Sequence, residues 1–397
     1  QDSSVVKDVY AKNQAALDAE VAMLRKIPQT YVDVQEQRDR QVLIDGRWRC
    51  DFASCNYLGM DLHPEVMHAI PAALDKWGVH PSWTRAVASP GLYAELEREL
   101  ADLLGAPTTL VFPSIHLLHI GVLPMLAGFN GVILKDNAAH HSIYEACLRS
   151  QADGIEWVEF AHNNIDDLER KLSRYRPEQS KIIAVDGVYS MSGEFPPLPE
   201  MVLLAKKYNA LIYVDDAHGV GVIGANPTEE MPYGHGGCGI VKYFGLDYEA
   251  DRIIYVGGLS KAFSSYGAFI TCFDDAMKAR LSLAGPFVFS GPSPVASLAS
   301  ALAGLRINRR EGDRMRHRVY QLTHKLVTAA KAIGYEVDNE HDFPIVGVVI
   351  GNVDEVTEAC QLLWEYDILI TPATYPAVPM HRNLVRFSIT AANTEAE

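Results

Sequence analysis

The sequence predicts an α/β protein with a mostly parallel, doubly wound sheet in a large domain, followed by a small α+β C-terminal domain. Between residues 108 and 215, short apolar runs alternate with helical patterns, which implies repeated strand-helix-strand units with right-handed crossovers. After about residue 333 the pattern changes to separate strands around a single helix. That change indicates a second, smaller unit.

Residues 1–60 are predicted to form an arm made of a helix and a hairpin. Apolar positions at helical spacing over about residues 5–26 predict an amphipathic helix that packs on the body or on a partner. Residues 42–49 are predicted to form a hairpin, because Asp45-Gly46 suits a tight type I′ turn between alternating strands.

The large domain is predicted over residues 61–292. It begins with helices at 64–77 and 91–104, the second ending at Gly105 as a C-cap. A loop or small insertion at 224–251 and a strand at 253–256 follow the alternating region. The strands predicted in that region are 108–112, 132–134, 155–160, 181–185 and 210–215, with helices beginning at 114, 142, 164 and 198.

The small C-terminal domain is predicted over residues 293–397. Helical patterns continue to about residue 333, and a helix at 353–366 lies between strands at 346–350 and 385–389. This mixture is typical of an α+β unit.

Composition narrows the class of protein and partner. A chain of 397 residues with 48% hydrophobic content can bury a large core. It has no apolar run of membrane-spanning length and no secretion signal, so we predict a cytoplasmic protein without a membrane partner. A net charge of −15 disfavours nucleic acid. The six cysteines lack CxxC pairs and metal-ligand spacing, which predicts inert thiols and no metal site.

Three reactive side chains stand at the ends of predicted strands. Asp215 and His218 follow the apolar run 210–214, and Lys261 follows 253–256, so all three are expected at the rim where open α/β sheets collect ligands. A desolvated lysine is a usable amine nucleophile, and a carboxylate facing a pyridinium nitrogen is what pyridoxal phosphate (PLP) requires. The pattern therefore predicts Schiff-base chemistry on Lys261.

The segment Val-Asp-Asp-Ala-His-Gly-Val-Gly at 214–221, followed by Lys261, resembles the α-oxoamine synthases. The resemblance covers about residues 51–392 and implies PLP fold type I and a homodimer with active sites at the subunit interface. It implies that Lys261 carries PLP, that Asp215 faces the pyridine nitrogen, and that His218, with Ser190, bonds the phenolic oxygen. From the residues alone, Lys261 could instead be a surface lysine and His218 a capping or core histidine.

The resemblance also implies contacts to the ring and the substrate. His140 is expected to stack on the pyridine ring, although a one-residue slip would put His141 there. Arg386 is expected to hold an amino-acid carboxylate with a two-bond fork, its alternative being a structural ion pair. Asn56 and Arg85 are expected at the substrate.

The phosphate is expected at the helix that begins near residue 114, where the family has a Ser-Gly-aromatic turn with open backbone N–H groups. Gly258 replaces a family threonine, so serines are expected to compensate. The residues expected around the phosphate are Ser114, Ile115, His116, Ser260, Ser264 and Ser290, the last reaching across the dimer.

Other departures from the family concern the substrates. Cys55 replaces an asparagine, Thr371 replaces a second arginine, and only Gly78 and Arg85 remain of a glycine-rich loop that accommodates the acyl thioester. Loss of this loop favours an acyl donor that is attached to a carrier protein or whose acyl group is small. The family normally has another helix after the strand at 385–389, so we expect this chain to be a piece of a longer protein.

The predicted function is a PLP-dependent acyltransferase. It would condense an α-amino acid with an acyl thioester, on coenzyme A or on an acyl-carrier protein, and lose carbon dioxide to give an α-aminoketone, with Lys261 as general base. The first alternative is another PLP reaction on this fold: an aldolase, another carbon–carbon bond former, a transaminase or a racemase. The second alternative is a non-catalytic partner subunit.

Overall fold

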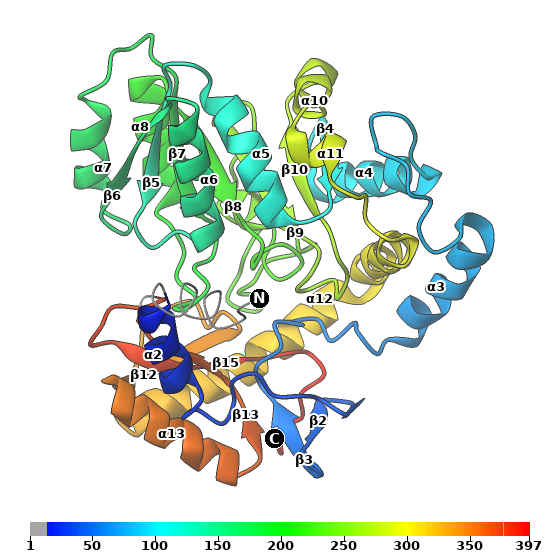
Figure 1. The fold of residues 1–397 in the computed structure, drawn as a ribbon, viewed down its shortest axis with the longest axis vertical. Coiled ribbons are helices and arrows are strands. Elements are labelled where there is room, and N and C mark those ends of the chain that lie inside the picture. The colour runs from blue at the N-terminus through cyan, green and yellow to red at the C-terminus, as the bar shows by residue number, and fades with distance from the viewer. Residues whose placement is uncertain (1–13, 376) are drawn as a thin grey trace, which may run out of the picture.

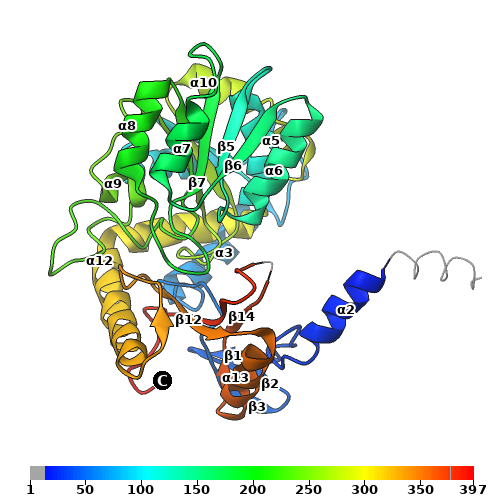
Figure 2. The ribbon, with the colours of Figure 1, turned by 90° about the vertical axis from the view of Figure 1, so that its left-hand side faces the viewer.

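The structure is a computed structural model that describes residues 14–375 and 377–397. The helix predicted over residues 5–26 therefore lies partly outside the described residues, and its described part is α2 (Ala15–Leu24). Figure 2 shows α2 extending away from the rest of the chain, and its Leu17 and Val21 side chains are exposed.

A seven-stranded sheet in the order β4-β10-β9-β8-β7-β5-β6 forms the centre of the larger part (Figure 1). Every adjacent pair from β9 through β6 is parallel, whereas β10 is antiparallel to both β9 and β4. The predicted mostly parallel sheet is confirmed. Its strands are β4 (Thr108–Phe112), β5 (Val132–Asp136), β6 (Glu156–Phe160), β7 (Lys181–Asp186), β8 (Leu211–Asp215), β9 (Ile253–Gly258) and β10 (Ala268–Cys272).

Helices cover both faces of this sheet, because alternate strand residues point to opposite sides and both sets are apolar. The first face packs against α4 (Gly91–Leu104), α7 (Ile165–Leu172), α8 (Leu198–Tyr208) and the start of α12 (Val295–Ala332). The second packs against α5 (Ile115–Ala127), α6 (His141–Ala152), α10 (Asp275–Leu281) and α11 (Gly285–Phe289). The sheet is therefore doubly wound, as predicted.

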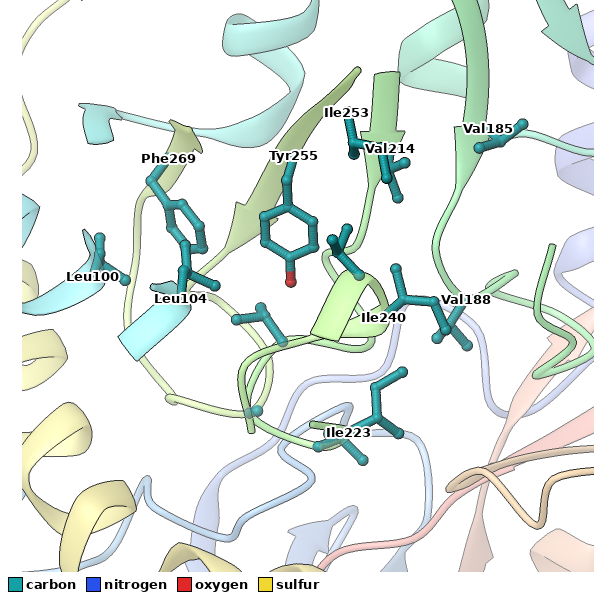
Figure 3. Close-up of a cluster of buried hydrophobic side chains, with 14 of the residues drawn as sticks. Leu100, Leu104, Val185, Val188, Val214, Ile223, Ile240, Ile253, Tyr255 and Phe269 are labelled. Carbon is teal, nitrogen blue, oxygen red and sulfur yellow. The ribbon is translucent and has the colours of Figure 1, made fainter. Parts of the chain in front are cut away.

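The segment at 224–251, predicted as a loop or small insertion, contains one short helix, α9 (Ile240–Tyr243), that the prediction did not specify. Figure 3 shows Ile240 of α9 among side chains of the first face, including Val214 and Tyr255. A buried contact of this kind brings together distant parts of the chain, so the local Gly-rich pattern did not reveal it.

The C-terminal part holds a four-stranded antiparallel sheet in the order β11-β12-β15-β14, packed against α13 (Val353–Glu365) and the end of α12. The strands are β11 (Glu336–Val337), β12 (Ile345–Gly351), β14 (Thr371–Ala373) and β15 (Asn383–Ser388). The predicted mixture of strands and helix is confirmed. None of the described helices combines the length and apolar character needed to cross a membrane.

The predicted hairpin is also confirmed. Strands β2 (Gln41–Ile44) and β3 (Arg47–Asp51) pair antiparallel, and Asp45 and Gly46 take φ angles of 50° and 75°, as a type I′ turn requires. β1 (Glu36–Arg38) extends the hairpin on one side, and β13 (Ile368–Leu369) pairs with β3 on the other. The arm and the C-terminal part thus share a sheet.

α3 (Pro64–Trp77) and α4 match the two predicted helices. Gly105 ends α4 in the left-handed conformation, with a φ of 62°, as a C-cap glycine does.

Candidate active site

The carboxyl ends of the parallel strands bring the predicted reactive groups together. Asp215 is the last residue of β8, Lys261 follows β9, and His140 caps the N-terminus of α6 just after β5. The charges of Lys261 and His140 both act on Asp215, and the charges of Lys261 and Arg386 act on His218. These five residues therefore form one cluster, here called the rim cluster.

Asp215 lies beside a histidine that the sequence analysis did not single out. The Nε2 atom of His119, on α5, is 2.8 Å from Asp215 Oδ2, and its Nδ1 atom is 2.7 Å from the Tyr213 hydroxyl. Burial would raise the pKa of Asp215, but the attraction of His119, together with Lys261 and His140, holds it below its usual value. Asp215 is therefore an ionised carboxylate at neutral pH.

The neighbouring Asp216 faces away from this cluster. Its Oδ2 accepts hydrogen bonds from the Tyr255 hydroxyl and the Ile240 backbone N–H, both at 2.8 Å. Burial raises the pKa of Asp216 to about 7, despite these bonds. Asp216 thus ties α9 to β9, and Asp215 is the aspartate that belongs to the rim cluster.

His218 is buried and neutral. Its Nδ1 atom lies 2.7 Å from the hydroxyl of Tyr57, which follows the hairpin. Burial, Lys261 and Arg386 hold the pKa of His218 well below its usual value. In the tautomer in which Nδ1 accepts the Tyr57 hydroxyl proton, the single ring proton is on Nε2, which makes Nε2 a donor.

Of the two adjacent histidines, His140 belongs to the cluster. Its backbone N–H donates to both carboxylate oxygens of Asp186 on β7, at 3.1 and 3.2 Å, and its Nδ1 lies 2.7 Å from Ser142 Oγ. Burial and the nearby Lys261 lower the pKa of His140, so its ring is neutral at pH 7. His141 is instead exposed beside Glu145.

Lys261 is half-buried at a tight turn after β9. In the described part of the chain, its amine makes no hydrogen bond or ion pair. The turn is closed by the Ser264 N–H, which donates to the Lys261 carbonyl, and by the Ser264 hydroxyl, which donates to Asn56. Asn56, predicted at the substrate, is therefore held beside the lysine, whereas Ser260 is exposed next to it.

At the predicted phosphate site, Ile115 stands where the family has a glycine, and Gly258 stands where the family has a threonine. Ser114 caps α5 by accepting the Leu117 N–H, and Ile115 begins the helix. A Cβ atom placed on Gly258 would lie 3.9 Å from the Ile115 side chain and 3.4 Å from Ala217. Ile115 thus approaches the space in which the family has its threonine. His116 is exposed and pairs with Glu145.

Arg386 on β15 is 7% exposed and is anchored at only part of its guanidinium. Nη1 donates to the Ser190 carbonyl at 2.9 Å, and Nη2 lies 3.5 Å from both Cys55 Sγ and Thr371 Oγ1. Its buried Nε has no partner in the described chain. No carboxylate of the described residues pairs with it, which argues against the alternative of a structural ion pair.

Two predicted residues are engaged elsewhere within this chain. Arg85 donates to Glu97 at 3.1 Å, to the Val111 carbonyl at 2.6 Å and to Ser89 at 3.2 Å. The Ser290 hydroxyl donates to the Pro286 carbonyl at 2.5 Å. Their contacts to acyl donor and phosphate stay predictions.

The predicted absence of metal ligands and of cysteine pairs can be compared with the described residues. All six cysteines are free thiols. Among residues 14–375 and 377–397, no group of three or more His, Cys, Asp or Glu side chains is arranged to hold a metal ion.

Comparison with known proteins agrees with this geometry. Residues 50–397 match the family model for aminotransferase class I and II. The chain is 33% identical over 370 residues to 8-amino-7-oxononanoate synthase of Thermosipho melanesiensis, covering 93% of this chain and 90% of that protein. It is 32% identical to serine palmitoyltransferase of Sphingobacterium spiritivorum, covering 91% and 86%. The chain belongs to the α-oxoamine synthases.

Solved structures of this family have the same fold as the α-oxoamine synthase described here. A structure of SPT with PLP has a TM-score of 0.88 and 27% identity, and covers 97% of this chain and 95% of that one. Sphingomonas wittichii serine palmitoyltransferase has a TM-score of 0.87 and 27% identity, with 97% and 93% covered. The fold-type prediction is therefore confirmed over nearly the whole chain.

Proposed function

We propose that this chain is a PLP-dependent acyltransferase that condenses an α-amino acid with an acyl thioester and releases carbon dioxide, giving an α-aminoketone. The observation that carries the proposal is the rim cluster, in which a lysine amine without a partner among the described residues lies with an ionised aspartate and a neutral histidine. The resemblance of residues 214–221 and Lys261 to the α-oxoamine synthases supports the same roles here.

The residues present fit PLP. Asp215 offers an ionised carboxylate to a protonated pyridine nitrogen, and His218 offers its Nε2–H to a phenolic oxygen. The N-terminus of α5, capped by Ser114, offers backbone N–H groups to a phosphate. When bound, PLP supplies an electron sink for a carbanion at the substrate α-carbon.

Side chains of this chain would bind the substrate, move its proton and hold the cofactor in place. The partly unpaired Arg386 guanidinium binds the substrate carboxylate and fixes the amino acid by a two-bond fork. Lys261 holds its amine ready to bind the cofactor and then to take the α-proton at Nζ. His140 would lie against the face of the pyridine ring and hold its plane fixed when PLP is bound.

We infer a homodimer from an exposed apolar surface, here called the apolar edge. Hydrogen bonds from His80 and Thr84 to the carbonyls of Pro292 and Val288 join its two segments. Ser290 lies on one of these segments, as expected for a residue that reaches a second copy. The apolar edge consists of Val79, Trp83, Val87, Leu283 and Phe289.

Sedimentation tests the dimer. Phe289→Glu should dissociate it, because a charge would replace a side chain that is 87% exposed in the single chain. Leu203→Glu, at an exposed site on α8, is the matched control and should leave the mass unchanged. A monomeric wild-type protein would contradict the dimer.

Absorbance of the purified protein supplied with PLP tests the function, with Lys261→Ala as control. A visible band that borohydride removes, leaving a pyridoxyl mass on the Lys261 peptide, is expected in the wild type only. Amino acids are then screened with and without acyl thioesters. Release of a free thiol that depends on the amino acid supports the acyltransferase, whereas turnover without any thioester would favour another PLP reaction. Failure to bind PLP would favour a non-catalytic subunit.

A further inference from the structure

His119 is a buried titratable group for which the proposed function has no assigned use. The side chains of His119 and Tyr213 are both fully buried, and Asp215 is 5% exposed. Side chains two apart on a strand share a face, so Tyr213 and Asp215 both point toward α5, where His119 bonds to each. The three side chains form a continuous hydrogen-bonded chain beneath the rim cluster.

The direction of these hydrogen bonds follows from the groups involved. An ionised carboxylate can only accept, so the bond to Asp215 requires a proton on His119 Nε2. In the tautomer that carries its one proton on Nε2, Nδ1 is an acceptor, and the Tyr213 hydroxyl donates to it. Burial and the charge of Asp215 hold the pKa of Tyr213 well above its usual value, so this hydroxyl keeps its proton.

A second buried carboxylate, that of Asp186, lies next to Asp215, and the two compete to be the ionised one. Asp186 is the residue opposite Asp215 in the parallel pairing of β7 with β8, and it is also buried. Two like charges this close disfavour each other, so one of the two carboxylates is protonated. Burial and the charge of Asp215 hold the pKa of Asp186 well above its usual value.

The two aspartates differ in the hydrogen bonds that they accept. Asp186 accepts only the backbone N–H of His140 among the hydrogen bonds of the described chain, whereas Asp215 accepts the Nε2–H of His119 as well as the Ala217 backbone N–H. Lys261 acts on both carboxylates, so it does not separate them. Asp215 therefore accepts a hydrogen bond from a side chain, that of His119, whereas Asp186 does not among the described residues.

We propose that His119 is a positioning residue that makes Asp215, rather than Asp186, the carboxylate that carries the negative charge facing the cofactor's pyridine nitrogen. Tyr213 fixes the tautomer that allows this. The inference rests on the proposed function, because it needs Asp215 to face that nitrogen. His119 acts through Asp215, to which it is hydrogen-bonded, and is assigned no direct contact with the cofactor.

The test is the ¹⁵N NMR signal of [¹⁵N]PLP bound to the full chain, which reports protonation of the pyridine nitrogen. In the His119→Leu variant, we expect the ¹⁵N signal to move toward that of an unprotonated pyridine nitrogen. kcat should fall about tenfold to a hundredfold, the range for losing a hydrogen bond to a charged group. Adding Asp186→Asn removes the competing acid and should restore the protonated signal. A merely structural effect of His119→Leu would not be reversed in this way.

The controls separate the possible failures. Asp215→Asn must lose the protonated signal; if it does not, the assignment of Asp215 in the proposed function is wrong, whatever His119 does. Asp186→Asn alone should keep the wild-type signal, and its loss would place the charge on Asp186 and overturn the inference, even if His119→Leu fails to fold. A folded, PLP-bound His119→Leu with the wild-type signal would overturn it as well.

Discussion

Replacing His162 by glutamine should destabilise the protein near neutral pH and have little effect above pH 9. His162 Nδ1 lies 3.0 Å from Asp136 Oδ1, and Nε2 lies 3.5 Å from Glu194 Oε2. Burial opposes the charged ring, but the hydrogen bonds and charges of these two carboxylates raise the pKa of His162 to about 9. Asp136 also accepts the Ala138 N–H, so this ion cluster holds the loop that leads to His140.

The sign follows from proton linkage. The pKa of His162 is higher in the folded than in the unfolded chain, so the stabilisation is complete below about pH 6.5 and is lost as the pH rises through about 9. A pKa shift from about 6.5 to about 9 contributes at most about 2.5 kcal/mol to the free energy of unfolding at pH 7, about 1.4 kcal/mol at pH 8 and about 0.4 kcal/mol at pH 9.

Urea unfolding of wild type and His162→Gln from pH 6 to 9.5 measures this difference in unfolding free energy. His68→Gln, at an exposed histidine on α3, is the matched control and should change stability by less than about 0.5 kcal/mol at every pH. A difference for His162→Gln that stays constant across the range would refute the reasoning, because uncharged packing does not titrate.

Three further predictions test the site and the fold. Arg386→Lys keeps the charge but loses the fork, so KM for the amino acid should rise about tenfold or more in steady-state assays; an unchanged KM would exclude carboxylate binding there. Gly258→Thr should weaken PLP binding, and adding Ile115→Gly should recover part of the loss, with a coupling of about 1 kcal/mol from cofactor titrations. Additive effects would mean that the two side chains do not share a space. Gly239→Ala should lower the unfolding free energy by about 2 kcal/mol or more, since φ is 86° and the new Cβ would lie 2.0 Å from the Tyr255 hydroxyl oxygen; a loss below about 0.5 kcal/mol in urea would contradict the packing.

Much of the fold could be predicted from the sequence because each strand produces a recognisable pattern within a short stretch of residues. A parallel strand buried on both faces reads as an unbroken apolar run, as in Ile253–Val256, and glycine at a turn or cap marks where an element ends. The antiparallel direction of β10 could not be predicted, because strand pairing is a long-range choice between segments that look alike.

The candidate site was predictable where one short segment carries several reactive groups, as 214–221 does. His119 was missed because it sits within the apolar run Leu117-Leu118-His119-Ile120 and has the appearance of a core histidine. The available signal was the pair Tyr213 and Asp215 on one face of β8, which needs a buried partner. Only the packing of α5 against that face identifies it.

The long helix α12 has a mechanical consequence for catalysis. At 38 residues its axis is about 57 Å long, and Figure 2 shows that it bends, so that its first half lies in the core of the large sheet and its last turns lie in the core of the sheet that carries Arg386. Near its middle, the Arg316 guanidinium folds over Gly312 and donates to the Gly221 carbonyl at 3.0 Å, which clamps the helix to the loop after Asp215. α12 therefore connects the two sheets whose side chains, Arg386 and Lys261, meet in the rim cluster. A displacement of the sheet that carries Arg386 away from the rim cluster would bend α12 and strain the contact between Arg316 and Gly221.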